Sequence, residues 1–538
     1  MMDVMLSRRV LGVVLTGAVL LLAGKINAAP LPGQSIAFRQ AVAEAAATDR
    51  EIAEFYRETD YRAIWTDQSD AAEARRQALV RALSQVERHG LPMGRYDLDG
   101  LMAQMGAARS LRDLGQIEVV LSQTYLRYAR DVQTGILVPS QIDEGIKREV
   151  IYRDRADFLR EIATGKPRDV MRALPPQSQD YARLMKEKLR LEQVIALGDW
   201  GAVVPAETLK PGQQGAAVVA LRDRLIAMGY LDRSASRDFD ARLQQAVQAF
   251  QSDHGLDPDG VVGASTMAAL NMSAAGRLKS VIVAMERERW LVRDRGARHI
   301  LVNLTDFSAR ILDADIVTFR TRAVVGLNET GRRSPEFSDQ MEYMVVNPTW
   351  HVPRSIAVKE YLPQMQRNPN AAGHLRLYDS RGREVSRAAV DFGAYSARSF
   401  PFAIKQPPSE RNALGLVKFM FPNKYNIYLH DTPQKALFDR DKRDFSHGCI
   451  RLQQPFDFAY ALLSKQESNP EAYFQSVLNT KRETYVYLDQ PVPVHIIYRT
   501  AFTQAQGRIQ YRGDVYGRDA KIWDALERLG VSLAAVQG

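Results

Sequence analysis

The sequence contains very little cysteine: one residue, Cys449, in a chain of 538. A single thiol cannot form an intramolecular disulfide, so this class of cross-link does not stabilise the protein. The lone sulfur is therefore either an inert core residue or a chemical tool. Its sequence context decides between the two.

Long blocks of one charge are also missing. The formal net charge is +9, but acidic and basic residues are spread along the whole chain. Nucleic-acid binding therefore has little support, whereas attraction to an anionic polymer is compatible with this charge. Charged residues make up 25% and hydrophobic residues 46%, as is typical of globular protein.

The apolar run at the N-terminus is short for a membrane span. It extends from Val10 to Ala23, follows Arg8 and Arg9, and precedes small residues at positions 28 and 29. This layout predicts a signal peptide within residues 1–28, and therefore export. An uncleaved N-terminal membrane anchor is the alternative, and the arginine pair leaves the export route open.

The length of the chain predicts several domains, about three or four. Helical periodicity dominates residues 35–200, and a compact three-helix pattern occupies 211–271. Two apolar helical stripes mark this pattern: Val218, Leu221, Leu225 and Met228, and Leu243, Val247 and Phe250. Short strands separated by turn signals fill residues 298–490, interrupted by a mixed segment at about 353–405. A helix is expected at residues 355–365 within that segment, and separate strands are expected at 485–487, 494–498 and 508–511. Residues 491–538 are thus expected to form strands and a helix.

Chemically reactive residues concentrate in one stretch, Asn426 to Leu452. The β-forming residues 425–429 predict a strand that ends at His430, and a polar connection leads back to Ser446-His447-Gly448-Cys449. Gly448 can adopt backbone angles that other residues avoid, so the chain can turn sharply and present N–H groups beside the sulfur.

These residue types are the ones that cysteine acyl transfer needs. A free thiol, with a pKa near ~8.5, is mostly protonated at pH 7, so an imidazole must accept its proton. Acyl transfer also needs donors directed at the developing oxyanion, and the amides of residues 447–449 are placed to supply them.

The motif resembles a known family. A histidine followed about fifteen residues later by Ser/Thr-His-Gly-Cys is similar to the catalytic motif of the L,D-transpeptidases, the YkuD-type cysteine enzymes of peptidoglycan. Asn347–Pro353 resembles their NPxWxVP phrase. Residues 406–415 resemble their QPPGPxNALG loop, with Ser409 in place of glycine. Arg451 stands where many members have asparagine, although the large periplasmic branch commonly has arginine.

The resemblance extends to the other domains and implies a fold class. Residues 211–271 resemble peptidoglycan-binding domain 1, and residues 35–200 more loosely resemble the helical scaffold of the large periplasmic L,D-transpeptidases. The implied protein is multidomain α+β. It would combine a helical scaffold, a three-helix peptidoglycan-binding module, and a mostly antiparallel β catalytic domain with an inserted capping subdomain.

The resemblance also implies roles for single residues. Cys449 would be the nucleophile and His430 the general base, steadied by the backbone carbonyl of Asp431. The amides of His447, Gly448 and Cys449 would line the oxyanion hole. Candidate substrate-binding residues are Tyr428, Trp350, Arg451 and Ser446. No metal and no other cofactor is implied.

The implied activity is acyl transfer from tetrapeptide stems of peptidoglycan, with release of D-alanine and formation of 3→3 cross-links in the periplasm. Such cross-links contribute to cell-wall biogenesis and cell shape, and β-lactams of the carbapenem class would be covalent inhibitors. The sequence identifies no protein partner.

Three alternatives stay open. His430, His447 and Cys449 could bind zinc, although the motif has no nearby glutamate to act as a base. A cysteine L,D-carboxypeptidase or endopeptidase would hydrolyse the same thioester. A non-enzymatic wall-binding protein would use the β-domain only as a scaffold.

Overall fold

The computed structural model describes residues 35–291, 295–503 and 507–533, and these divide into two compact units. The first unit comprises residues 35–80, 97–126 and 155–168, and the second comprises 81–96, 127–154 and 169–533. The predicted signal peptide lies outside the described residues. Of the helices that are described, none is long and apolar enough to cross a membrane.

The first unit is helical. Phe55, Tyr56, Trp65 and Tyr125 are buried in its core, as expected for aromatic residues at helical spacing. Its helices, including those that end beyond it, are α1 (Ile36–Ala46), α2 (Arg50–Glu58), α3 (Asp70–Leu83), α4 (Leu98–Ala107), α5 (Leu111–Thr134) and α7 (Arg155–Thr164).

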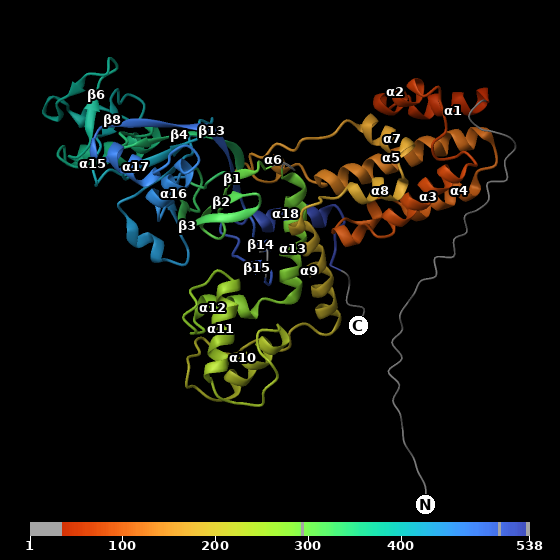
Figure 1. Cartoon of the computed structure of the whole chain (residues 1–538), viewed down its shortest axis with the longest axis horizontal. Coiled ribbons are helices and arrows are strands. Elements are labelled where there is room, and N and C mark those ends of the chain that lie inside the picture. Colours follow the sequence, from red (N-terminus) through yellow and green to blue (C-terminus); the bar gives the residue numbers. More distant parts are fainter. Residues whose placement is uncertain (1–34, 292–294, 504–506, 534–538) are drawn as a thin grey trace, which may run out of the picture. The chain divides into compact units, whose positions relative to one another are not determined.

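The second unit begins with short helices and one long helical pair. The pair consists of α9 (Gln179–Ala196) and α13 (Ala274–Trp290), which pack side by side (Figure 1). The short helices are the 3₁₀ turns Val86–His89 and Met93–Arg95, α6 (Pro139–Ile142) and α8 (Pro167–Ala173).

Helix α13 buries charged residues near its C-terminal end. Arg287 contacts Glu336 at 2.7 Å and Asp519 at 2.8 Å, and Arg289 contacts Glu286 at 2.7 Å. Buried charges need such partners, because an unpaired charge in a protein interior is strongly unfavourable. The two ion pairs of Arg287 tie α13 to Glu336, which directly precedes residue 337 of the β-domain, and to α18 (Arg518–Arg528).

The predicted three-helix module is present as α10 (Ala216–Ala227), α11 (Ala241–Asp253) and α12 (Ala264–Asn271). Its apolar stripes meet in a core that includes Leu221, Leu225, Leu243 and Phe250, all at most 1% exposed. The helical spacing of these residues in the sequence therefore predicted the buried faces correctly.

A nine-stranded sheet dominates the region that follows. Its order is β11-β3-β12-β10-β9-β4-β13-β1-β2, and an additional pairing of β3 with β2 closes the sheet on itself. Most strand pairs are antiparallel, as predicted, but β1–β13, β10–β12 and β11–β3 are parallel. The strands are β1 (Arg298–Asn303), β2 (Ser308–Asp313), β3 (Ile316–Gly326), β4 (Phe337–Val346), β9 (Val417–Met420), β10 (Leu429–His430), β11 (Asp444–Ser446), β12 (Ile450–Leu452) and β13 (Thr484–Ile497).

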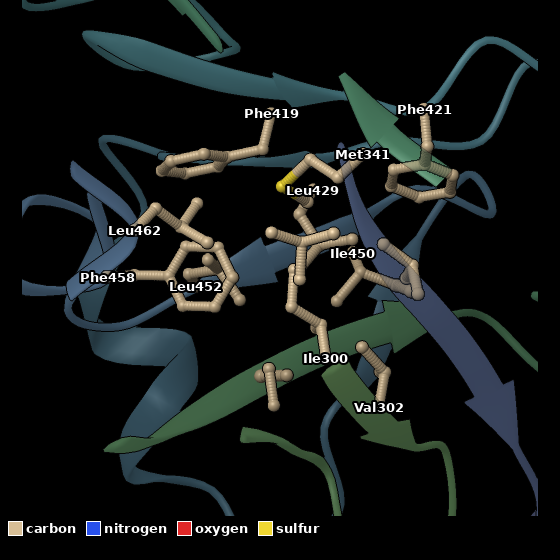
Figure 2. Packing of buried hydrophobic residues seen from close by; sticks show 14 of the residues in the cluster. Ile300, Val302, Met341, Phe419, Phe421, Leu429, Ile450, Leu452, Phe458 and Leu462 are labelled. Carbon is tan, nitrogen blue, oxygen red and sulfur yellow. The ribbon is translucent and has the colours of Figure 1, made fainter. Parts of the chain in front are cut away.

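One face of this sheet carries the main hydrophobic core. Leu429 from β10 and Ile450 from β12 point into it, beside Phe419 and Met341 (Figure 2). Helix α16 (Pro455–Leu463) adds Phe458, and α17 (Pro470–Asn479) packs against α16. Because side chains alternate along a strand, the neighbours of the core residues in β10 and β12 face the opposite side.

Three local expectations differ from the structure. The strand predicted for residues 425–429 is reduced to its end, because Asn426 has a positive φ of 56° and the Asn423 side chain accepts from the Tyr425 and Ile427 amides in a turn. The separate strands expected near 485 and 494 are one strand, β13, which runs across position 490. The expected strand near 510 is β15 (Gln510–Tyr511), paired with β14 (Ala501–Phe502) outside the large sheet.

The predicted insert has its own small core and sheet. The sheet has the order β5-β8-β6-β7, formed by β5 (Trp350–His351), β8 (Ala403–Gln406), β6 (Arg376–Tyr378) and β7 (Glu384–Val385). The single helix expected for 355–365 is divided into α14 (Arg354–Ile356), a π-helical turn (Ala357–Tyr361) and α15 (Leu362–Arg367). Short 3₁₀ turns follow at Arg387–Ala389 and Phe392–Ala394, and another lies at Lys435–Asp439 near the sheet.

Candidate active site

Two adjacent parallel strands bring the candidate nucleophile and base to one face of the sheet. In the register of β10 and β12, Leu429 lies opposite Ile450 and His430 opposite Arg451. The Ile450 amide donates to the Tyr428 carbonyl at 3.1 Å, so Cys449 continues this register beside Tyr428. Register partners in parallel strands share a face. Tyr428, His430, Cys449 and Arg451 therefore face away from the core that Leu429 and Ile450 enter.

The chain reaches Cys449 through a tightly bonded turn. Gly448 has a φ of 112°, which strongly favours glycine, and its N–H donates to the Ser446 hydroxyl at 3.1 Å. The Ser446 hydroxyl donates in turn to the Cys449 carbonyl at 2.5 Å. On the other side, Ser334 donates to the Gly448 carbonyl at 2.6 Å. The two serines thus fix the peptide groups on both sides of the turn.

This turn leaves two amides available near the sulfur. The Gly448 N–H is occupied by Ser446, whereas the N–H groups of His447 and Cys449 donate to no acceptor within the described part of the chain. Ser446, a candidate substrate contact from the sequence, is buried and holds the turn. A developing oxyanion would therefore meet the N–H groups of His447 and Cys449 more readily than that of Gly448.

His430 is held as a neutral imidazole. Its Nδ1 lies 2.5 Å from the Asp431 carbonyl oxygen, which fixes the proton on Nδ1 and leaves Nε2 as the proton acceptor. Burial and the positive charge of Arg451 lower the pKa of His430 to about 3, with Lys418 acting in the same direction. Lys418 and Arg451 are the register partners of His430 on the two neighbouring strands.

A buried carboxylate positions the Asp431 carbonyl. The Asp431 side chain accepts from the Thr432 amide at 2.7 Å, from the Leu416 amide at 2.9 Å and from the Lys435 ammonium at 2.6 Å. Gly415 makes room for it, because a Cβ at that position would lie 2.3 Å from the Asp431 carboxyl carbon. The sequence indicated the carbonyl of Asp431, but it gave no sign of this support for its side chain.

Cys449 is half-buried, and its sulfur lies 3.5 Å from the Asn426 carbonyl oxygen. Burial raises the pKa of the thiol to about 11, although hydrogen bonds from Tyr428 and the charge of Arg451 act in the opposite direction. The resting site therefore contains a neutral thiol and a neutral imidazole. Between these two side chains themselves, the described atoms form no hydrogen bond.

The His447 side chain faces the insert. Its Nε2 lies 2.6 Å from Oε1 of Glu360, which belongs to the π-helical turn, and the same oxygen lies 2.8 Å from Nη2 of Arg332. Sequence reasoning missed Glu360 and Arg332, because no local pattern links positions so far apart in the chain. The positions become neighbours only when the insert folds back on the sheet.

The remaining candidate residues lie at different depths. Tyr428 lies beside both His430, with ring centroids 5.6 Å apart, and Cys449. Arg451 donates to the Gln434 side chain at 2.6 Å and forms no ion pair with any described residue. Trp350 is 8% exposed and packs in the core of the insert, 6.2 Å from the Tyr361 ring. Arg451 is thus a cation available to an anionic ligand at this site.

The residues described here contain no group of three or more His, Cys, Asp or Glu side chains arranged to hold a metal ion. His447 faces Glu360, and His430 faces the Asp431 carbonyl. The two imidazoles and the thiol therefore have separate partners. The arrangement is suited to proton transfer and nucleophilic attack.

Three family models match separate parts of the chain. Residues 297–486 match the L,D-transpeptidase catalytic domain, residues 214–270 a putative peptidoglycan binding domain, and residues 50–187 a scaffold domain. The three matches follow one another without overlap. They agree with the resemblance found in the motifs.

Two curated relatives show similarity over parts of their length. A putative L,D-transpeptidase of Haemophilus influenzae is 31% identical over 255 residues, which cover 46% of this chain and 51% of that protein. The N-acetylmuramoyl-L-alanine amidase CwlM of Mycobacterium tuberculosis is 42% identical over 74 residues, 12% of this chain and 18% of that protein. The matched regions thus span about half, or less, of the relatives' length.

A solved structure was also found. The L,D-transpeptidase (residues 123–326) from Xylanimonas cellulosilytica is 16% identical, and the alignment covers 54% of this chain and 98% of that chain. The TM-score is 0.16, which is too low to indicate that the two chains share a fold.

Proposed function

We propose, from the premise that residues 297–486 are an L,D-transpeptidase catalytic domain, that this protein forms 3→3 cross-links in peptidoglycan by cysteine acyl transfer. The observation that carries the proposal is the placement of Cys449 and His430 on adjacent parallel strands, facing the same side of the sheet. A nucleophile and a base in this relation fit a two-step acyl transfer.

In the first step, Nε2 of His430 accepts the Cys449 proton while the sulfur attacks the carbonyl carbon of the third stem residue. The N–H groups of His447 and Cys449 donate to the oxyanion of the tetrahedral intermediate. When the intermediate collapses, the C–N bond breaks and His430 returns the proton to the leaving nitrogen. D-alanine departs, and a thioester on Cys449 remains.

In the second step, the side-chain amine of a neighbouring third stem residue attacks the thioester. The amine loses a proton to His430, the C–S bond breaks, and the proton passes to the sulfur. The new amide is the 3→3 cross-link, and the enzyme returns to its neutral thiol and imidazole. The insert would favour the amine over water by covering the thioester.

The lowered pKa of His430 fits this cycle. With a pKa of about 3, the imidazole is unprotonated at neutral pH and can accept a proton in each step. With the thiol pKa at about 11, the thiolate forms only as the proton is transferred, so base and nucleophile act together. Arg451, which has no ion-pair partner within residues 35–291, 295–503 and 507–533, would bind a carboxylate of the stem peptide.

The other domain matches support the same substrate. A putative peptidoglycan binding domain at 214–270 would hold the polymer near the catalytic domain. Domains that act on peptidoglycan point to a location outside the cytoplasm. We propose the periplasm, with the N-terminal segment as signal peptide or inner-membrane anchor.

The test is product analysis with the full chain. Purified protein incubated with disaccharide-tetrapeptide should release D-alanine and yield 3→3 dimers, detected by mass analysis of muropeptides. Cys449→Ala should yield neither product, and a carbapenem should add its mass to Cys449 in the unaltered protein. Release of D-alanine without dimers would indicate a carboxypeptidase. Use of pentapeptide donors only, with 4→3 dimers, would contradict the proposal.

A further inference from the structure

Glu360 connects the insert to the turn that carries the candidate nucleophile. One of its carboxylate oxygens lies 2.6 Å from Nε2 of His447 and 2.8 Å from Nη2 of Arg332. The side chains of Glu360 and His447 are 33% and 36% exposed, so solvent screens this contact only in part. The catalytic steps proposed above use neither Glu360 nor the His447 side chain.

Arg332 belongs to the segment that holds the other side of the same turn. The hydroxyl of Ser334, two residues later, donates to the Gly448 carbonyl at 2.6 Å, and the Ser334 backbone N–H donates to the Tyr516 hydroxyl at 3.3 Å. The Arg332 carbonyl oxygen lies 3.7 Å from the position of a Cβ on Gly448. Glu360 therefore joins His447 to the segment 332–334, and the turn is held from the sheet and from the insert together.

The backbone around Glu360 is itself unusual. Ala357–Tyr361 forms a π-helical turn between the short helices α14 and α15. Such turns are rare and are found disproportionately at functional sites. The turn also contributes Tyr361, whose ring meets Trp350 at 6.2 Å in the core of the insert. The segment that presents Glu360 is thus anchored to the insert core.

We propose that Glu360 is a positioning residue that holds the His447 side chain, so that the N–H groups of His447 and Cys449 are fixed where the oxyanion develops. The contact also links the seating of the insert to the assembly of this donor pair. The inference rests on the proposed acyl transfer. Donors fixed in advance stabilise the transition state without a reorganisation cost during the reaction.

The first test compares two carboxylates of the insert. Glu360→Gln preserves shape but removes the charge, and Glu360→Ala removes the contact. The matched control is Glu384→Gln, whose partner, Arg376 at 3.2 Å, also belongs to the insert. We expect kcat for 3→3 dimers to fall by about tenfold in Glu360→Ala, with less loss in Glu360→Gln and none in the control. KM should change little, because the donors act on the transition state.

Thermal unfolding separates positioning from simple loss of stability. Charged contacts between side chains that are about one third exposed contribute little to folding, so Tm should change by no more than about 2 °C in the Glu360 variants. Partial recovery of kcat in Glu360→Asp would support the positioning role. A kcat loss that follows a large fall in Tm would contradict it.

A double-mutant cycle tests whether Glu360 acts through His447. If it does, the double variant His447→Gln/Glu360→Ala should show a fall in kcat no larger than that of the more impaired single variant. The inference would be overturned if the two fold-losses in kcat multiply in the double variant. It would also be overturned if Glu360→Ala has the same kcat as the Glu384→Gln control. Neither outcome affects the proposed acyl transfer, which instead fails if Cys449→Ala still forms dimers.

Discussion

Two histidines in different regions of the second unit have similar surroundings at one ring nitrogen. His254, at the end of α11 in the three-helix module, holds Nδ1 2.7 Å from the Phe250 carbonyl oxygen. His430, in the β-domain, holds Nδ1 2.5 Å from the Asp431 carbonyl oxygen. Burial lowers the pKa of both imidazoles. By these criteria alone, either one would be a neutral base.

The difference lies in what surrounds the rest of the ring. The His254 ring stacks on the Phe250 ring, with centroids 3.8 Å apart and planes at 19°, and on the Tyr511 ring of β15, with centroids 5.7 Å apart, so its surroundings are those of a packing residue. The His430 ring lies on the sheet face that also carries Cys449 and Arg451. A lowered pKa therefore does not identify a catalytic base. What distinguishes His430 as the candidate base is the Cys449 thiol on the same face of the sheet.

The largest effect should come from removing each imidazole in turn. We expect His430→Ala to reduce dimer formation by on the order of 10²–10⁴, because the base is lost. His254→Ala should lower Tm, because a stacked ring is removed from the module, yet retain the rate per folded molecule. Rates measured on samples matched for folded fraction check both. If His254→Ala reduces the rate per folded molecule as much as His430→Ala does, the comparison fails. If His447→Ala reduces that rate more than His430→Ala does, the base is His447 and not His430.

A second measurement tests whether the Cys449 thiol has already transferred its proton to His430 in the absence of substrate. With the Cys449 pKa at about 11, the thiolate fraction should rise about tenfold per pH unit between pH 7 and 10. Alkylation by iodoacetamide should follow this rise, and Cys449 is the only cysteine to be labelled. An alkylation rate that no longer changes with pH above pH 6 would indicate a preformed thiolate–imidazolium pair and contradict the neutral resting state.

The smallest effect concerns the carbonyl that fixes each Nδ1. A helix supplies the carbonyl for His254, whereas the Asp431 carbonyl depends on its own side chain, which two amides and Lys435 hold in place. Asp431→Asn should lower kcat by about tenfold, because one oxygen acceptor becomes a donor and the carbonyl shifts. Lys435→Met, which removes only an exposed partner, is the matched control and should lose less. Equal kcat values for Asp431→Asn and the unaltered protein would show that the carbonyl needs no such support.

Local sequence patterns predicted much of this molecule. The stripes of Leu221, Leu243 and Phe250 are buried as expected, since the helical repeat alone determines which residues share a face. The motif at 446–449 identified its turn, because the positive φ of Gly448 strongly favours glycine. The predicted domain limits and catalytic roles stay predictions.

Predictions failed where nearby side chains override strand propensity. Residues 425–427 are rich in β-formers, yet Asn423 and Asn426 turn the chain there, so β10 begins only at Leu429. Side-chain bonds to the local backbone compete with strand pairing, and residue preferences summed over a window do not reveal them.

The sequence by itself determined the chemistry available here: one thiol, a histidine at the end of a strand, and a glycine that permits the turn between them. Tertiary structure alone decided how these groups are used. Pairing of β10 with β12 on one side and with β9 on the other buried His430 between Arg451 and Lys418, and burial, followed by these two charges, lowers the pKa of its imidazole. Folding of the insert brought Glu360 to His447. Both results depend on contacts between distant segments, which no local pattern encodes, because pairing register and insert packing are set by the whole core.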